Sequence, residues 1–79
     1  MKLEYHHIRF VDFTVRKQKT KTFICQNIHL GIQVGWVIWF DEQYVFQPSN
    51  NVGAFRASTL ADIQHFIMQL MKDRKEVKP

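Results

Sequence analysis

The fold of this chain is decided by the stretch GWVIWF at residues 35–40, which contains no polar side chain and is followed by two acidic residues. A short run of aromatic and β-branched residues bounded by charge is typical of a strand with both faces covered. Alternation along the strand places Val37 and Trp39 on one face. The other face receives the remaining large side chains, Trp36, Ile38 and Phe40. The sequence contains one amphipathic helix, so what covers the second face is the central question about function.

Runs of aromatic and β-branched residues predict strands at residues 4–15, 22–30, 32–40 and 44–47. In the first strand the apolar alternation changes phase between Phe10 and Val11, which predicts a β-bulge there. Pro48 ends the fourth strand because proline has no amide hydrogen to donate. The connections are short, so consecutive strands are expected to pair as an antiparallel meander.

A helix is expected at residues 59–75, with Thr59 as its N-cap and Asp62 completing a capping box. Apolar residues then recur at three- and four-residue spacing, which predicts one stripe facing the sheet. The stripe consists of Leu60, Ile63, Phe66, Ile67 and Leu70. Residues 76–79 are expected to fray. Residues 1–79 are thus expected to form a single α+β domain of two layers, a four-stranded antiparallel meander packed against one C-terminal helix.

The composition indicates a small cytoplasmic protein. A chain of 79 residues buries only roughly 60 % of its unfolded surface, which allows one modest core. Hydrophobic residues make up 46 % of the chain, enough to fold without disulfides, and the single Cys25 has no bridging partner. Polar residues interrupt the start of the chain, and no apolar run approaches the roughly 18 residues of a membrane helix. We therefore expect neither a secretory signal nor a membrane segment.

The inventory of reactive side chains argues against an enzyme. Cys25 and His29 share strand parity, so a nucleophilic pair can be drawn, but a nucleophile also needs an orienting partner and an oxyanion site. A small buried hydrophobe beside an ordinary surface histidine is therefore the favoured interpretation. His6 and His7 alternate if they lie in a strand, so they cannot chelate one metal ion together. No glycine-rich phosphate loop is present. We expect no catalytic residue, no metal and no cofactor, and identify no small-molecule substrate.

The strongest functional feature is a basic cluster in the connection 16–21, and it comprises Arg16, Lys17, Lys19 and Lys21. The connection contains neither glycine nor asparagine, so a longer loop is expected rather than a two-residue turn. Four cations at a hairpin tip can contact successive phosphates of a nucleic acid. Aromatic side chains of the sheet can stack bases if their face is open, with Trp36, Phe40 and Tyr44 as the candidates. The alternative is a solvated turn that keeps the protein soluble.

A second hypothesis treats the chain as a protein-interaction module. One helix covers one sheet face, yet apolar side chains occupy both faces of the central strands. Exposed apolar patches of this kind mark interfaces. The sequence therefore also predicts a homodimer that packs through Trp36, Ile38 and Phe40. An enzyme built around Cys25 and His29 is the third alternative.

The segments 34–40, 44–48 and 60–70 resemble those of small uncharacterised bacterial proteins, several of which belong to mobile elements. Those proteins share a Leu-Gly pair followed by an aliphatic residue and a Trp-aromatic pair, a Tyr-x-Phe-x-Pro strand, and a helix with Asp-Ile and Phe-Ile. The resemblance implies an accessory protein of a mobile element or regulatory system and no particular activity. The positions of Trp36 and Ile38 are usually polar in that pattern, so the departure here favours dimerisation or another partner on this face.

The order of elements is also similar to that of the three-stranded DNA-binding domains of plant AP2-type regulators and phage-type integrases. Those domains read DNA with arginines and tryptophans on an exposed sheet face. Here the corresponding face has no arginine apart from Arg9 at its edge. The similarity therefore implies contact with phosphates rather than direct reading of bases.

Overall fold

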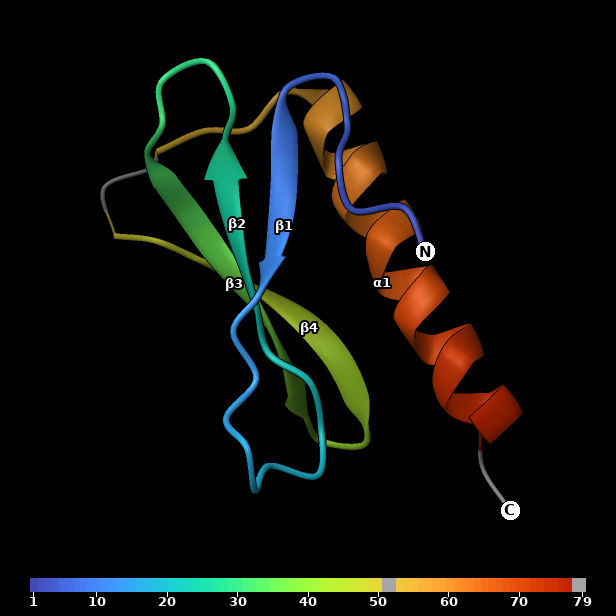
Figure 1. Cartoon of the computed structure of the whole chain (residues 1–79). Coiled ribbons are helices and arrows are strands. Elements are labelled where there is room, and N and C mark those ends of the chain that lie inside the picture. Colours follow the sequence, from blue (N-terminus) through green and yellow to red (C-terminus); the bar gives the residue numbers. More distant parts are fainter. Residues whose placement is uncertain (51–52, 78–79) are drawn as a thin grey trace.

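The computed structural model describes residues 1–50 and 53–77, and it contains one sheet and one helix (Figure 1). The strands are β1 (Ile8–Asp12), β2 (Phe23–Asn27), β3 (Gln33–Phe40) and β4 (Gln43–Pro48), and the helix is α1 (Ala57–Val77). The strands pair in the order β1-β2-β3-β4, all antiparallel. The helix covers one face of this meander. The predicted two-layer α+β fold is confirmed.

The first strand is shorter than the predicted range 4–15, and the predicted bulge at Phe10 and Val11 is wrong. The register with β2 runs unbroken along β1. Before the strand the chain doubles back, because the amide of Phe10 donates to the carbonyl of Leu3 at 2.8 Å. After it, the amide of Thr14 donates to the carboxylate of Asp12 at 2.9 Å, an Asx-type turn that ends the strand. The phase change in the sequence thus reflects chain reversals at both ends of β1.

A β-bulge does occur, between β2 and β3. Cys25 pairs with Gly35 whereas Gln26 pairs with Gln33, which leaves Val34 as the extra residue. Because of this insertion, both Val34 and Gly35 are buried. A side chain at position 35 has no room, since an added Cβ lies 2.5 Å from the ring of Phe46. The bulge therefore brings a second β3 side chain into the core without breaking the sheet.

The second strand ends at Asn27 rather than at residue 30, because the Asn27 side chain organises a turn. Its Oδ1 accepts hydrogen bonds from the amides of His29 and Leu30, both at 2.9 Å. Gly31 completes the turn with a φ of 69°, a conformation that favours glycine. The third strand then starts at Gln33, and the fourth extends one residue beyond the predicted range 44–47 at each end.

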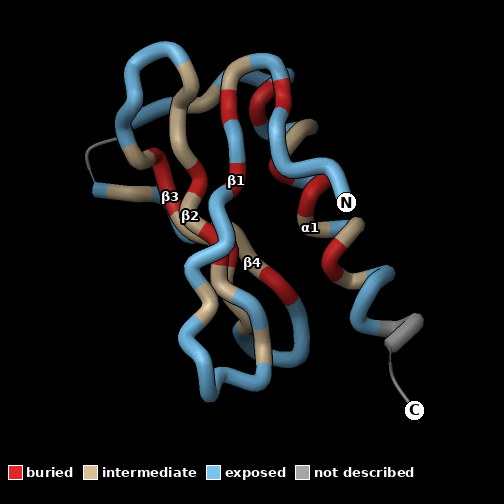
Figure 2. Tube along the Cα trace, viewed as in Figure 1, coloured by how far each residue is buried: buried red, intermediate tan, exposed pale blue. Residues whose placement is uncertain are grey.

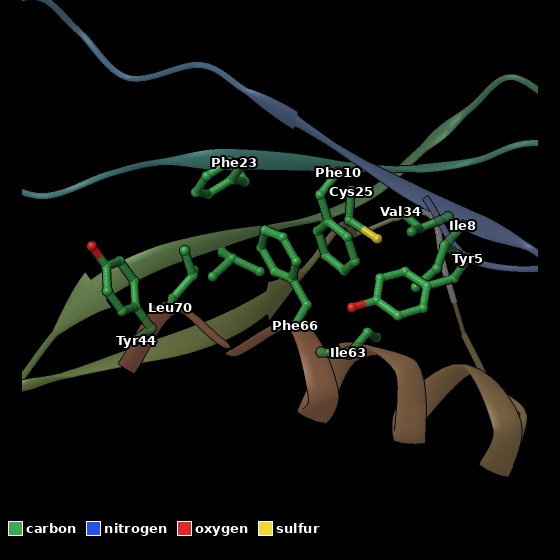
Figure 3. Close-up of a cluster of buried hydrophobic side chains, with 11 residues drawn as sticks. Tyr5, Ile8, Phe10, Phe23, Cys25, Val34, Tyr44, Ile63, Phe66 and Leu70 are labelled. Atoms are coloured by element: carbon green, nitrogen blue, oxygen red, sulfur yellow. The ribbon is translucent and has the colours of Figure 1, made fainter. Parts of the chain in front are cut away.

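The core lies between the sheet and α1 (Figures 2 and 3). The rings of Phe10 and Phe66 stack with centroids 3.8 Å apart, and Phe23 meets Phe66 edge-on at 4.9 Å. Val37 is fully buried and Trp39 packs against the same cluster. The helix therefore covers the Val37/Trp39 face.

The helix begins at Ala57, two residues earlier than predicted. The amide of Leu60 donates to the carbonyl of Arg56 at 3.0 Å, so Arg56 holds the N-cap position. Thr59 is not the N-cap, because it lies within the first turn and is only 8 % exposed. Leu60 is 50 % exposed and does not belong to the buried stripe. The buried helix residues are Thr59, Ile63, Phe66 and Leu70.

The helix continues to Val77, two residues past the predicted end, and Lys78 and Pro79 lie outside the described residues. The N-terminal segment is fastened to it, since the side-chain amide of Gln69 donates to the carbonyl of Lys2 at 3.0 Å and to the hydroxyl of Tyr5 at 3.2 Å. In the part of the chain that the structure describes, no helix has the length and apolar character needed to cross a membrane.

Candidate nucleic-acid interface

The connection between β1 and β2 forms an ordered hairpin loop. The amide of Gln18 donates to the carbonyl of Val15 at 2.9 Å, and the Gln18 side chain accepts from the Val15 amide at 3.2 Å. The side-chain amide of Gln18 also donates to the hydroxyl of Thr22 at 2.7 Å. The Thr22 amide donates to the hydroxyl of Thr14 at 3.1 Å across the loop. Short polar side chains thus supply the order that a glycine-containing turn would otherwise provide.

The four predicted cations of this loop, Arg16, Lys17, Lys19 and Lys21, are all exposed. The loop extends from the end of the sheet at which the β3–β4 connection also lies, as Figure 2 shows in pale blue. Because its backbone is ordered by internal hydrogen bonds, the cations are presented on a defined scaffold. This arrangement suits contact with an extended polyanion.

A chain of contacts connects the basic loop to the C-terminal half of α1. The amide of Lys21 donates to the hydroxyl of Tyr44 at 3.1 Å. The ring of Tyr44 meets that of Trp39 edge-on at 5.1 Å, and the guanidinium of Arg74 lies 4.1 Å above Trp39. Lys72 and Arg74 are exposed. The basic loop and the basic end of the helix therefore belong to the same end of the molecule.

The sheet face opposite α1 carries the residues that the sequence predicted there. Trp36 and Ile38 are half-buried by their strand neighbours, and Phe40 is 64 % exposed. Trp36 lies in a cross-strand row with Ile24 and Gln47. Phe13, at the start of the basic loop, is 61 % exposed. Exposed aromatic side chains are therefore present both on this face, at Phe40, and at the start of the basic loop, at Phe13.

Tyr44 is not a stacking residue of this face. It is buried against the core on the helix side, and its hydroxyl is occupied by the Lys21 amide. The tyrosine thus positions the basic loop and offers no ring to a ligand. Of the three predicted stacking residues, Trp36 and Phe40 remain.

The nucleophilic pair of Cys25 and His29, which the sequence left as a third alternative, does not form. Cys25 is fully buried in the core, and burial raises the pKa of its thiol to about 12. His29 lies in the β2–β3 turn, where its Nε2 is 3.2 Å from Nδ1 of His7. The thiol therefore stays protonated at neutral pH and lacks a neighbouring base of this kind.

A cluster of three histidines was missed by the sequence reasoning. The expectation that His6 and His7 point to opposite sides is wrong, because residues 6 and 7 lie in a bend rather than a strand. Their ring centroids are 4.3 Å apart, and His29 lies 5.3 Å from His7. Tyr5 and Ile8 are both buried although residues three apart in a strand point to opposite faces, which is consistent with a bend between them. Among the described residues, no three His, Cys, Asp or Glu side chains are arranged to hold a metal ion.

The turn between β3 and β4 places two carboxylates at the same end as the basic loop. Asp41 and Glu42 are exposed and have φ values of 53° and 70°. Both values are typical of a two-residue hairpin turn of the primed type. Carboxylates repel anions, so this turn is less suited to contact with a polyanion than the basic loop.

Comparison with protein-family profiles, curated proteins and solved structures finds no match to this chain.

Proposed function

We propose that this chain is a non-enzymatic cytoplasmic module that binds single-stranded nucleic acid. The proposal rests on one observation, an uncovered sheet face with Trp36 and Phe40 that adjoins an ordered loop carrying four exposed cations. Bases stack on the aromatic side chains, while the phosphates contact the loop. The resemblance to bacterial proteins of mobile elements is consistent with such an accessory role.

Binding is expected to be largely independent of sequence. Readout of base edges needs hydrogen-bonding side chains such as arginine and asparagine at the contact surface. On the open face, Arg9 donates to the Gln26 side chain at 3.0 Å, so its guanidinium is already engaged. Stacking and phosphate contact accept any base, which supports binding to single-stranded nucleic acid of any sequence rather than to one particular sequence.

Fluorescence anisotropy with labelled single-stranded and duplex oligonucleotides tests the loop. The variant Arg16→Gln/Lys17→Gln/Lys19→Gln/Lys21→Gln removes four cations, and each phosphate contact contributes a slope of about −0.7 to the plot of log affinity against log salt for single strands. We expect the slope to become shallower by up to about 3. Arg56→Gln, at the other end of the strands, serves as the control and is expected to bind like the parent. Absence of binding at low salt, or an equal loss in the control, would refute the proposal.

Stacking is tested separately with Trp36. Loss of one stacked ring costs about 1–3 kcal/mol, so Trp36→Ala is expected to weaken binding about 5- to 150-fold, whereas Trp36→Phe retains most of it. Quenching of tryptophan fluorescence on binding is expected to disappear in Trp36→Ala, because Trp39 is covered by Arg74. Unchanged affinity in Trp36→Ala would limit the contact to phosphates and contradict the use of the sheet face.

The same face favours a second candidate, a homodimer. The side chains of Ile24, Ile38 and Val45 lie on it beside Trp36, and aliphatic groups of this kind pack against protein more readily than against bases. Sedimentation equilibrium from micromolar to millimolar concentration measures this association. The homodimer would be established over nucleic-acid binding by two results together. Ile38→Lys would dissociate the dimer, and the loop variant would show the same nucleic-acid binding as the parent. A monomer at all concentrations would exclude it.

A further inference from the structure

A cavity of about 490 Å³ lies at the other end of the strands from the basic loop. It is lined by the N-terminal bend, the β2–β3 turn and residues 53–56 leading into α1, and it is open to solvent on one side. Its polar walls are His7, His29, Arg56 and Thr59, and its apolar walls include Ile32 and Phe55. The volume falls within the range of about 300–1,000 Å³ that is usual for small-molecule sites.

The polar wall of this cavity is rich in groups that carry or accept positive charge. His7 Nδ1 lies 3.2 Å from His29 Nε2, and the ring of His6 is 4.3 Å from that of His7. Partial burial lowers the pKa of His7, and His6, His29 and Arg56 lower it further, while Asp62 on α1 opposes the shift. Two imidazoles and a guanidinium thus line the pocket, with the His6 ring beside that of His7 and one carboxylate nearby.

We propose that this cavity binds a small organic phosphate, with its phosphoryl group against His7, His29 and Arg56 and its apolar body against Ile32 and Phe55. Arginine and protonated histidine donate charge-assisted hydrogen bonds to phosphoryl oxygens. The first turn of α1 contains no acidic residue, so the helix dipole adds to this attraction. The apolar walls favour an ester over the bare anion, because they gain from covering a hydrocarbon group.

The proposal predicts that binding strengthens on acidification. A bound phosphoryl group stabilises the imidazolium form of His7 and so raises its pKa from the lowered value of the free site. The ligand therefore binds more tightly below pH 6.5, where His7 gains its proton, than at pH 8. Because a phosphate ester also gains a proton near pH 6, phenyl sulfate, whose charge is constant, is the control for this dependence.

The experiment is a titration of the whole chain with phenyl phosphate, followed by the NMR signals of the histidine ring protons. We expect saturable shifts of the His7 and His29 signals at pH 6, binding at least tenfold weaker in Arg56→Gln, and no change in affinity in Lys17→Gln. Arg56 is exposed, so its replacement is expected to leave the fold intact. Thermal denaturation of each variant checks this.

Two further probes separate the parts of the proposed ligand. Inorganic phosphate supplies the anion alone and phenol supplies the ring alone, and both are expected to bind more weakly than phenyl phosphate. If phenol bound as tightly as phenyl phosphate, recognition of the anion would be refuted. If inorganic phosphate bound as tightly as phenyl phosphate, the contribution of the apolar walls would be refuted. Absence of histidine shifts, or an unchanged affinity in Arg56→Gln, would overturn the site altogether. The loop variant is expected to lose nucleic-acid binding but to bind phenyl phosphate like the parent. Either proposal can therefore be refuted without the other.

Discussion

The thiol of Cys25 lies between Phe10 of β1 and Gly35 of β3 in the sheet and has no exposed surface. In water a cysteine ionises at a moderately alkaline pH, but ionisation here would place a charge in the aromatic core. Burial therefore raises its pKa from 9.0 to about 12. At the scale of the residue, the same group that the sequence allowed as a nucleophile is a core side chain of small volume.

The raised pKa of Cys25 predicts a loss of stability in alkali. The folded thiol keeps its proton up to about pH 12 while the unfolded thiol loses it from about pH 9, so the contribution is complete below pH 9 and is lost as the pH rises towards 12. We expect the free energy of unfolding to fall in this window by up to about 1.4 kcal/mol per pH unit more than in Cys25→Ala. Urea denaturation of both proteins from pH 8 to 11 measures the difference. Identical slopes would contradict the assignment.

The β3–β4 hairpin is an element whose geometry conflicts with its residues. Its two-residue turn requires positive φ at both positions, which favours asparagine and glycine. The chain instead has Asp41 and Glu42 there, with φ of 53° and 70°. A left-handed conformation costs an ordinary residue about 1–2 kcal/mol, and the cross-strand pairs from Trp39–Tyr44 to Gly35–Pro48 must offset it. The pairing of two apolar strands thus determines the conformation of the turn, although Asp41 and Glu42 do not favour it.

This conflict predicts that the turn can be improved. Asp41→Asn/Glu42→Gly is expected to raise the free energy of unfolding by about 1 kcal/mol, because the new residues adopt the left-handed region at low cost. For a domain of this size the melting temperature rises by about 4–8 °C per kcal/mol. The control variant Asp41→Ala/Glu42→Ala removes the same charges but leaves ordinary residues at positive φ. If the alanine variant gains as much, then repulsion between charges, and not φ, explains the effect.

At the scale of the whole molecule, the sheet has two unlike faces. The face with Val37 is sealed by α1, whereas the face with Ile38 has no other element over it in the described ranges 1–50 and 53–77 (Figure 1). A four-stranded sheet with one helix buries one face only, and the second remains available to a ligand or a second copy. The basic loop and the histidine cavity lie at opposite ends of the strands. The molecule therefore separates its candidate sites along the sheet.

Neighbouring residues of β3 test this two-sided arrangement. Val37→Lys places a charge in the core and is expected to abolish the cooperative fold, since the total stability of a small domain is only about 5–15 kcal/mol. Ile38→Lys faces the open side and is expected to change stability by about 1 kcal/mol or less. Circular dichroism during urea denaturation of dilute protein compares them. Unfolding of the Ile38→Lys variant would mean that the second face is also core.

Local patterns predicted the layers but placed several boundaries wrongly. The strand runs and the apolar stripe from Ile63 to Leu70 are encoded in the order of residues, so the meander and its helix could be derived. The start of the helix could not be derived, because Arg56 holds the N-cap position and Thr59 is buried within the first turn. The capping box at Thr59 and Asp62 is a valid local signal that tertiary contacts override.

The same division holds for the candidate sites. The basic loop was evident from the sequence because its four cations are adjacent in the chain. The histidine cavity was not, since His7 and His29 are brought together only by the pairing of β1 with β2 and the bend before β1.

By itself, the sequence determined the element types, the alternation that separates Trp36 from Val37, and the clustering of cations in one loop. Only the tertiary structure decided which face of β3 the helix covers, where the bulge lies, and that Tyr44 and Cys25 are core rather than site. The physical reason is that alternation and charge are local properties of a chain. Burial depends on contacts between residues far apart in the sequence, such as Phe10 with Phe66.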